Sequence, residues 1–164
     1  MSQTVYNVDR TAALAGMLAD SGDVDVVSYP AGEDIESGRV VVLGANGTVG
    51  VPSATTLTKV VGVAIYRPSV EQAIGGGSAG YKAGEMVSVL RKGRIWAQFT
   101  GGTQAALGAV NVHHSSTTAT NRGKFTNSAT SSTAGAEITA APEGVITHKV
   151  GTSTLVQVSL NLPA

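Results

Sequence analysis

The residues that could support chemistry are few, and their spacing matches no known metal site. His113 and His114 are neighbours, and neighbours in a strand point to opposite faces, so they are poorly placed to share one ion. His148 could join one of them, but no cysteine or close carboxylate completes a set of three or four ligands. The chain has no cysteine at all, which excludes disulfides, thiolate metal sites and cysteine nucleophiles. We predict a structural or surface role for the histidines and no bound metal.

Carboxylates and small residues offer two further candidates for chemistry. Six acidic residues between positions 20 and 36 could bind calcium or supply paired carboxylates, but their spacing does not match an EF-hand loop: Asp20, Asp23, Asp25, Glu33, Asp34 and Glu36. The run GGGSAG at 75–80 leads into an extended segment instead of the Gly-Lys-Ser/Thr helix start of a phosphate loop, and no G-x-S-x-G elbow is present. We therefore predict a protein that is not an enzyme and that uses no cofactor.

Charge and hydropathy exclude two classes of partner. Lys plus Arg and Asp plus Glu both number 11, so the chain has no basic excess of the kind that binds nucleic acid by neutralising phosphates. No segment approaches the roughly 20 consecutive apolar residues that a membrane-spanning helix needs. The start MSQTVYNVDR has neither the basic cluster nor the apolar core of a signal peptide. We expect a soluble protein that binds neither nucleic acid nor membrane.

The elements expected around these residues are mostly short strands. In residues 9–22 the side chains Ala13, Leu14, Met17 and Leu18 recur at helical spacing, which predicts a helix of two to three turns that must dock to persist. From residue 39 onward, short β-branched segments alternate with Gly-rich turns. The pattern predicts an all-β protein with an N-terminal arm over 1–38, containing the short helix, and a β-barrel or β-sandwich domain over 39–164.

Four segments of the β region carry specific expectations. Asn46-Gly47 predicts a type I′ turn between strands, and residues 59–66 (KVVGVAIY) predict a strand buried on both faces. Residues 85–99 predict a hairpin that turns at Lys92-Gly93. Residues 115–141 predict a long loop or a meander of weak strands around GKFTN. At the end of the chain, alternation places Val156, Val158 and Leu160 on one face of a strand.

Apolar side chains on two of these segments have alternative roles that periodicity leaves open. Leu14, Met17 and Leu18 either dock a partner or cover the core of their own domain. The predicted hairpin is apolar on both sides, so Val87, Val89 and Trp96 belong either to the core or to a subunit interface.

Four blocks of the sequence, in this order, resemble the phage structural cement family of capsid decoration proteins: LAGMLADSGDVDVVSY, GEDIESGRVVV, VVGVAIYRP and GYKAGEMVSVLRKGRIWAQF. The resemblance covers roughly residues 10 to 112 and fades in the Ser/Thr-rich part. It implies a small β-barrel or jelly-roll-like domain with an extended N-terminal arm. It also implies a homo-oligomer, either dimer or trimer, on the outer capsid surface of the virion, made in the cytoplasm of the bacterial host.

The expected function is therefore to stabilise the phage head by bridging subunits of the major capsid protein. The expected capsid contacts lie in the arm, at Leu14, Met17, Leu18 and Ile35. The alternative is another virion module, such as a tail or fibre component or a carbohydrate-binding adhesive domain. A small hydrolase carried by the virion is a third hypothesis, and it lacks a convergent set of catalytic residues.

Overall fold

The computed structural model describes residues 13–20, 22–53, 59–67, 79–100, 110–115, 119–126, 137–140, 145–149 and 155–162. These residues form strands and two short 3-10 turns, η1 (Ala45–Gly47) and η2 (Ala119–Asn121). In this part of the chain no helix is long and apolar enough to cross a lipid bilayer.

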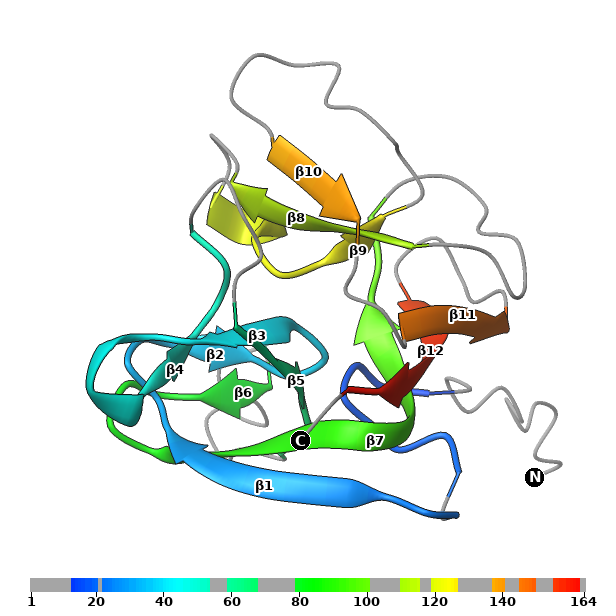
Figure 1. Ribbon diagram of the computed structural model, residues 1–164, viewed down its shortest axis with the longest axis horizontal. Helices are drawn as coiled ribbons and strands as arrows, with labels where there is room; N and C mark the ends of the chain where they lie inside the picture. The colour runs from blue at the N-terminus through cyan, green and yellow to red at the C-terminus, as the bar shows by residue number, and fades with distance from the viewer. Residues whose placement is uncertain are drawn as a thin grey trace, which may run out of the picture.

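The strands form three antiparallel sheets (Figure 1). The large sheet has the order β11-β12-β7-β5-β3-β4, with β1 also paired to β7. The other two sheets are β10-β8-β9 and the short pair β2-β6. The bounds are β1 Asp25–Pro30, β2 Ile35–Glu36, β3 Val40–Leu43, β4 Val49–Gly50, β5 Val60–Ala64, β6 Gly80–Tyr81, β7 Met86–Gln98, β8 Asn111–Ser115, β9 Phe125–Thr126, β10 Glu137–Ala140, β11 Val145–Lys149 and β12 Leu155–Asn161.

Two hydrophobic clusters lie on opposite faces of the large sheet, because successive strand residues point to alternate faces. One cluster joins residues of β5, β7 and β12 to Val112 of β8 and Phe125 of β9. The other joins other residues of β5 and β7 to Ile35 of β2 and Tyr81 of β6. The large sheet thus has one small sheet against each face, and the prediction of an all-β fold is confirmed.

Three local predictions are confirmed. Asn46 and Gly47 both have positive φ, at 57° and 75°, and the Thr48 N–H bonds the Ala45 carbonyl across the turn between β3 and β4. Strand β5 lies between β3 and β7, and residues 61–64 are buried. In β12 the alternate residues Val156, Val158 and Leu160 are buried in one cluster. In each case the local pattern matched the tertiary environment.

The predicted hairpin at Lys92-Gly93 is wrong, because β7 runs continuously from Met86 to Gln98. Its first half pairs with β1 and β5, and its second half pairs with β12. Gly93 does have positive φ, at 125°, but the strand absorbs it at an irregularity where Asp25 pairs with Lys92 and Val26 with Leu90. A bulge places one extra residue in a strand and shifts the alternation of its side chains. In the sequence, this shift looks the same as the one that a hairpin turn produces.

The predicted helix is wrong over residues 13–20, the part of it that the structure describes. This segment makes a turn at Ala15 and Gly16, where the Met17 N–H bonds the Leu14 carbonyl at 3.1 Å, and it then runs along β7 with an antiparallel bridge between Leu18 and Ile95. Gly16 has φ +85°, which a right-handed helix does not allow. A helix of two to three turns has little stability of its own, so hydrogen bonds to the edge of β7 override the helical periodicity.

Two remaining expectations concern the architecture. The described strands do not close into a barrel, because the large sheet ends at β11 and β4. Within 115–141 the described residues form η2, β9 and β10, which fits the meander of short strands expected around GKFTN. The boundary at residue 38 between arm and domain stays a prediction.

Candidate docking surface

Exposed large apolar side chains concentrate near the N-terminal end of the described chain. Five of the seven in the described residues lie between positions 14 and 26: Leu14, Met17, Leu18, Val24 and Val26, with exposed fractions of 38–42%. The other two are Leu43 and Met86. We call Leu14, Met17 and Leu18 the N-terminal patch. Single exposed apolar residues are normal on a protein surface, whereas a group of them marks a contact surface.

Backbone hydrogen bonds hold the N-terminal patch in place. The Gly16 N–H bonds the Trp96 carbonyl at 2.6 Å, and the Trp96 N–H bonds the Met17 carbonyl at 2.9 Å. The Ala19 N–H bonds the Arg94 carbonyl at 2.9 Å. Because the main chain is fixed by the edge of β7, the patch is presented on a rigid support. Little conformational entropy remains to be lost when a partner covers it.

A close crossing of two glycines makes this attachment possible. The Tyr66 N–H bonds the Gly16 carbonyl at 2.7 Å, and the Gly38 N–H bonds the Ala64 carbonyl at 2.8 Å. A Cβ on Gly16 would lie 2.5 Å from the backbone nitrogen of Tyr66, and a Cβ on Gly38 would lie 2.8 Å from the backbone nitrogen of Gly16. Both glycines also have positive φ. Only residues without a side chain fit where the N-terminal segment crosses the main sheet.

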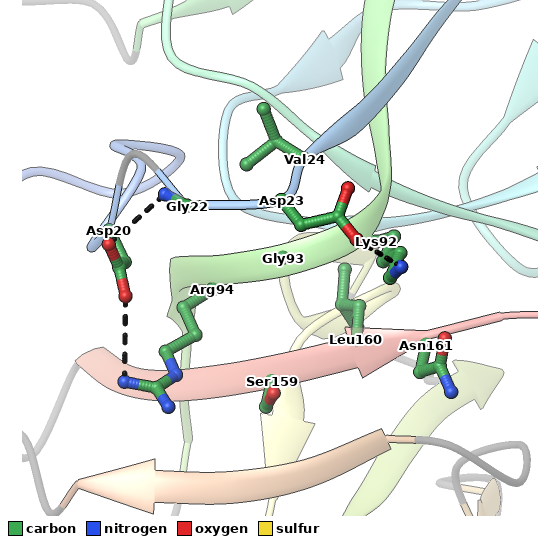
Figure 2. A pocket seen from close by; sticks show the side chains of 10 residues that line it. All are labelled: Asp20, Gly22, Asp23, Val24, Lys92, Gly93, Arg94, Ser159, Leu160 and Asn161. Atoms are coloured by element: carbon green, nitrogen blue, oxygen red, sulfur yellow. Dashed lines mark hydrogen bonds and ion pairs between the residues drawn. The ribbon is translucent and has the colours of Figure 1, made fainter.

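A shallow pocket of about 310 Å³ lies beside the patch, between the chain at 20–24 and strands β7 and β12 (Figure 2). Asp23 forms an ion pair with Lys92, and Asp20 lies 3.7 Å from Arg94. The hydrogen bond and charge of Asp23 raise the pKa of Lys92. Both cations in the pocket therefore face a carboxylate, and no histidine is among its lining residues. Each of the two carboxylates in the pocket is thus balanced by a cation, which leaves no unpaired charge among these four side chains.

Three more acidic residues of the 20–36 stretch lie in ion pairs at other places on the molecule. Glu33 contacts Arg122, and Asp34 contacts Lys82. Glu36 contacts Arg39. Five of the six acidic residues of this stretch are thus paired with five different cations and do not converge on one.

His113 and His114, predicted to have a structural or surface role, lie in the central strand of the three-stranded sheet β10-β8-β9. His113 and His114 are both buried in β8. Burial, and after it the charge of Lys124, lower the pKa of His113 below its ordinary value of 6.5. No group of three or more His, Cys, Asp or Glu side chains gathers within the part of the chain that the structure describes. The side chain of His148 lies outside that part.

Two arginines that the sequence analysis did not single out connect the large sheet to the segment between β8 and β9. Arg39 is 6% exposed and donates to the carbonyls of Arg122 and Thr120 at 2.9 and 3.0 Å. Arg122 in turn donates to the carbonyls of Pro52 and Val51 at 2.8 and 3.0 Å. Each guanidinium satisfies several backbone acceptors with its fixed fork of donors. The sequence offered one signal for this role: both arginines lie next to a glycine in a chain that has few charges.

Glu36 completes this network beneath Arg39. Burial raises the pKa of Glu36. The hydrogen bond from Gln98 and the charge of Arg39 outweigh this effect, so the pKa of Glu36 lies below its ordinary value. Gln98 donates to Glu36 at 3.1 Å and to the Ser37 carbonyl at 2.9 Å. The network joins Glu36 of β2 and Arg39, which precedes β3, to residues 120–122, which lie between β8 and β9.

The structure divides the residues expected to make contacts. The N-terminal patch is exposed, as a docking role requires. Ile35, also expected to contact the capsid, is 1% exposed and packs in the core near Tyr81. Val87 and Val89 are buried in the same cluster, so the core alternative describes them within this chain. Trp96 is half-buried on β7, where Gln157 of β12 is its partner.

The described residues form an all-β scaffold with an exposed apolar patch near its N-terminal end. The chain matches the family model described as "Structural cement protein (E217 gp24/Pam3 gp6)" over residues 1–161. It therefore belongs to the structural cement protein family of phages, whose members are not enzymes.

The other comparisons concern the fold. No curated protein sequence matches the chain. A chain in the solved capsid of Myoviridae phage XM1 is similar in structure, with a TM-score of 0.67 and 15% sequence identity, over 96% of this chain and 98% of that one. At this identity the likeness shows the shared fold alone. The family membership favours a capsid cement protein over the tail, fibre and carbohydrate-binding alternatives.

Proposed function

We propose that this cement protein binds the outer surface of the assembled phage head as a homo-oligomer and bridges neighbouring subunits of the major capsid protein. The observation that carries the proposal is the N-terminal patch, whose apolar side chains are exposed although their backbone is fixed to β7. An exposed apolar group on a rigid support loses little by ordering when it binds, so its burial contributes directly to affinity.

The magnitude of this contact suits a cement protein. Full burial of a Leu or Met side chain contributes about 1.5–3 kcal/mol, so three side chains that are about two-fifths exposed contribute about 2–4 kcal/mol together. One such contact is weak. A homo-oligomer that touches several coat subunits at once multiplies it through effective concentration. Binding restricted to the assembled lattice then opposes disassembly by mass action.

The proposal is tested by placing charge on the patch. The double variant Met17→Asp with Leu18→Asp should lower occupancy on capsids at least tenfold and leave the unfolding temperature nearly unchanged, because both side chains are already in contact with water. Leu43→Asp is the matched control, since Leu43 is 36% exposed on β3, away from the patch. Undiminished occupancy of the double variant would refute the role of the patch.

A further inference from the structure

The Met17 sulfur is the one readily oxidised atom of the N-terminal patch, because the side chains of Leu14 and Leu18 are hydrocarbon. Met17 is 41% exposed. The Leu14 N–H donates a hydrogen bond to the Met17 sulfur at 3.3 Å, and the Met17 N–H donates to the Leu14 carbonyl at 3.1 Å. These two bonds close the turn at Ala15 and Gly16, so they hold the sulfur in one orientation at the surface.

This hydrogen bond makes the two sides of the sulfur unequal. A thioether sulfur has two lone pairs, and the Leu14 N–H engages one of them. A peroxide therefore reacts through the other lone pair: the sulfur bonds one peroxide oxygen, the O–O bond breaks, and the second oxygen leaves as water. The sulfur gives up two electrons and the peroxide is reduced. The product, methionine sulfoxide, is polar and chiral at sulfur, so attack from one side gives one epimer in excess.

Oxidation at this position changes the character of the patch. A sulfoxide oxygen that is covered by an apolar surface loses its water without gaining a new donor, and such burial opposes binding. Met86 is also exposed, at 57%, but it lies at the start of β7, whereas the patch is bonded to Trp96 near the end of that strand. The chain thus carries a matched exposed methionine whose oxidation leaves the patch unaltered.

We propose that Met17 is a modification site at which peroxides form predominantly one sulfoxide epimer, and that this oxidation weakens docking of the N-terminal patch. Two reductases, each specific for one epimer, return methionine sulfoxide to methionine, so the modification is reversible. The effect on docking rests on the proposed function. The oxidation and its epimer excess do not depend on it.

The oxidation is tested by treating the full-length protein with hydrogen peroxide, once in its folded state and once in concentrated urea. Both samples are then digested to peptides, each is exposed to one of the two epimer-specific reductases, and the oxygen remaining on Met17 is measured by mass spectrometry. In the sample oxidised while folded, one reductase should restore most of the Met17 and the other little. In the sample oxidised in urea, both should restore equal shares. Equal shares from the folded protein, or a Met17 that stays unoxidised while Met86 is fully oxidised, would overturn the inference.

The effect on docking is tested by capsid occupancy before and after peroxide treatment, each protein being compared with its own untreated sample. Occupancy of the wild-type chain should fall about tenfold and should recover after reductase treatment. Met86→Leu should show the same fall, because its Met17 is intact, and Met17→Leu should show none. A fall in Met17→Leu, or full occupancy by wild-type protein whose Met17 is completely oxidised, would refute the effect.

The charged variant of the patch separates this failure from that of the proposed function. If Met17→Asp with Leu18→Asp lowers occupancy while oxidised wild-type protein binds fully, the proposed function stands and the redox effect is refuted. If neither change lowers occupancy, the docking role of the patch is refuted, and the redox effect on docking with it.

Discussion

The attachment of the N-terminal segment to β7 can be tested by a single methyl group at Gly16. Gly16 lies where the segment crosses the main sheet, with φ +85° and its carbonyl bonded to the Tyr66 N–H. In Gly16→Ala the new Cβ would lie 2.5 Å from the backbone nitrogen of Tyr66 and 3.0 Å from the carbonyl oxygen of Ala64. Both contacts are with backbone atoms of the main sheet, which cannot move aside as a flexible side chain can.

The expected magnitude has two parts. A left-handed backbone conformation costs a residue with a side chain about 1–2 kcal/mol. Forcing a methyl group into occupied space adds about 1–3 kcal/mol. Gly84→Ala isolates the first part, because Gly84 has almost the same φ, +87°, and nothing within 4 Å of its Cβ position. Gly16→Ala should therefore lower the free energy of unfolding by about 2–5 kcal/mol, and Gly84→Ala by about 1–2 kcal/mol.

Urea denaturation of both variants measures this difference, and capsid occupancy shows its functional consequence. Displacing the segment at Gly16 should disturb the N-terminal patch, so Gly16→Ala should occupy capsids less than Gly84→Ala does under conditions where both are folded. Equal stability of the two variants would show that residues 13–20 are not packed against the sheet at this crossing, and the account of a rigid patch would be refuted.

Three further predictions concern the interior. Arg39→Met removes a buried guanidinium that bonds the carbonyls of Thr120 and Arg122 and should lower the free energy of unfolding by about 3 kcal/mol, with Arg39→Lys in between; unchanged urea midpoints would contradict the role of the network. Gly93→Val should cost about 1 kcal/mol or more in thermal unfolding, since φ is +125° and the Cβ would meet Val24 at 2.9 Å, and a wild-type melting curve would contradict this. The pKa of His113 is lowered in the folded state, so the unfolded chain takes up the proton first and stability should fall as pH drops below about 6.5; His113→Gln should reduce that slope in melts from neutral pH to about 5, and an unaltered slope would assign it elsewhere.

Parts of the fold with a local cause could be predicted from the sequence. Asn46-Gly47 specifies its turn through the positive φ that these residues tolerate. The unbroken apolar run of β5 required burial on both faces, and the alternation of β12 required one buried face. In each of these segments, the conformation that the local sequence favours is also the one that suits its surroundings in the fold.

The errors arose where different structures share one local pattern. A glycine with positive φ after a lysine serves a hairpin or a bulge equally well, and only the strands beside β7 decide between them. Helical spacing in residues 13–18 was overridden by hydrogen bonds to Trp96, more than 70 positions away in the sequence. The docking role of Leu14, Met17 and Leu18 was among the alternatives because the sequence shows that these side chains are apolar. The sequence does not show that they are exposed, because their exposure depends on long-range pairing with β7.

The central claim is that this cement protein recognises the assembled coat lattice. The most direct measurement is co-sedimentation of the purified protein with mature, expanded capsids that lack it, beside size-exclusion binding to unassembled coat protein at the same concentration. The account predicts saturable binding to the capsids and no complex with free coat subunits, because bridging requires neighbouring subunits held in place by the lattice. Binding of similar affinity to isolated coat subunits, or no binding to the capsids, would contradict it.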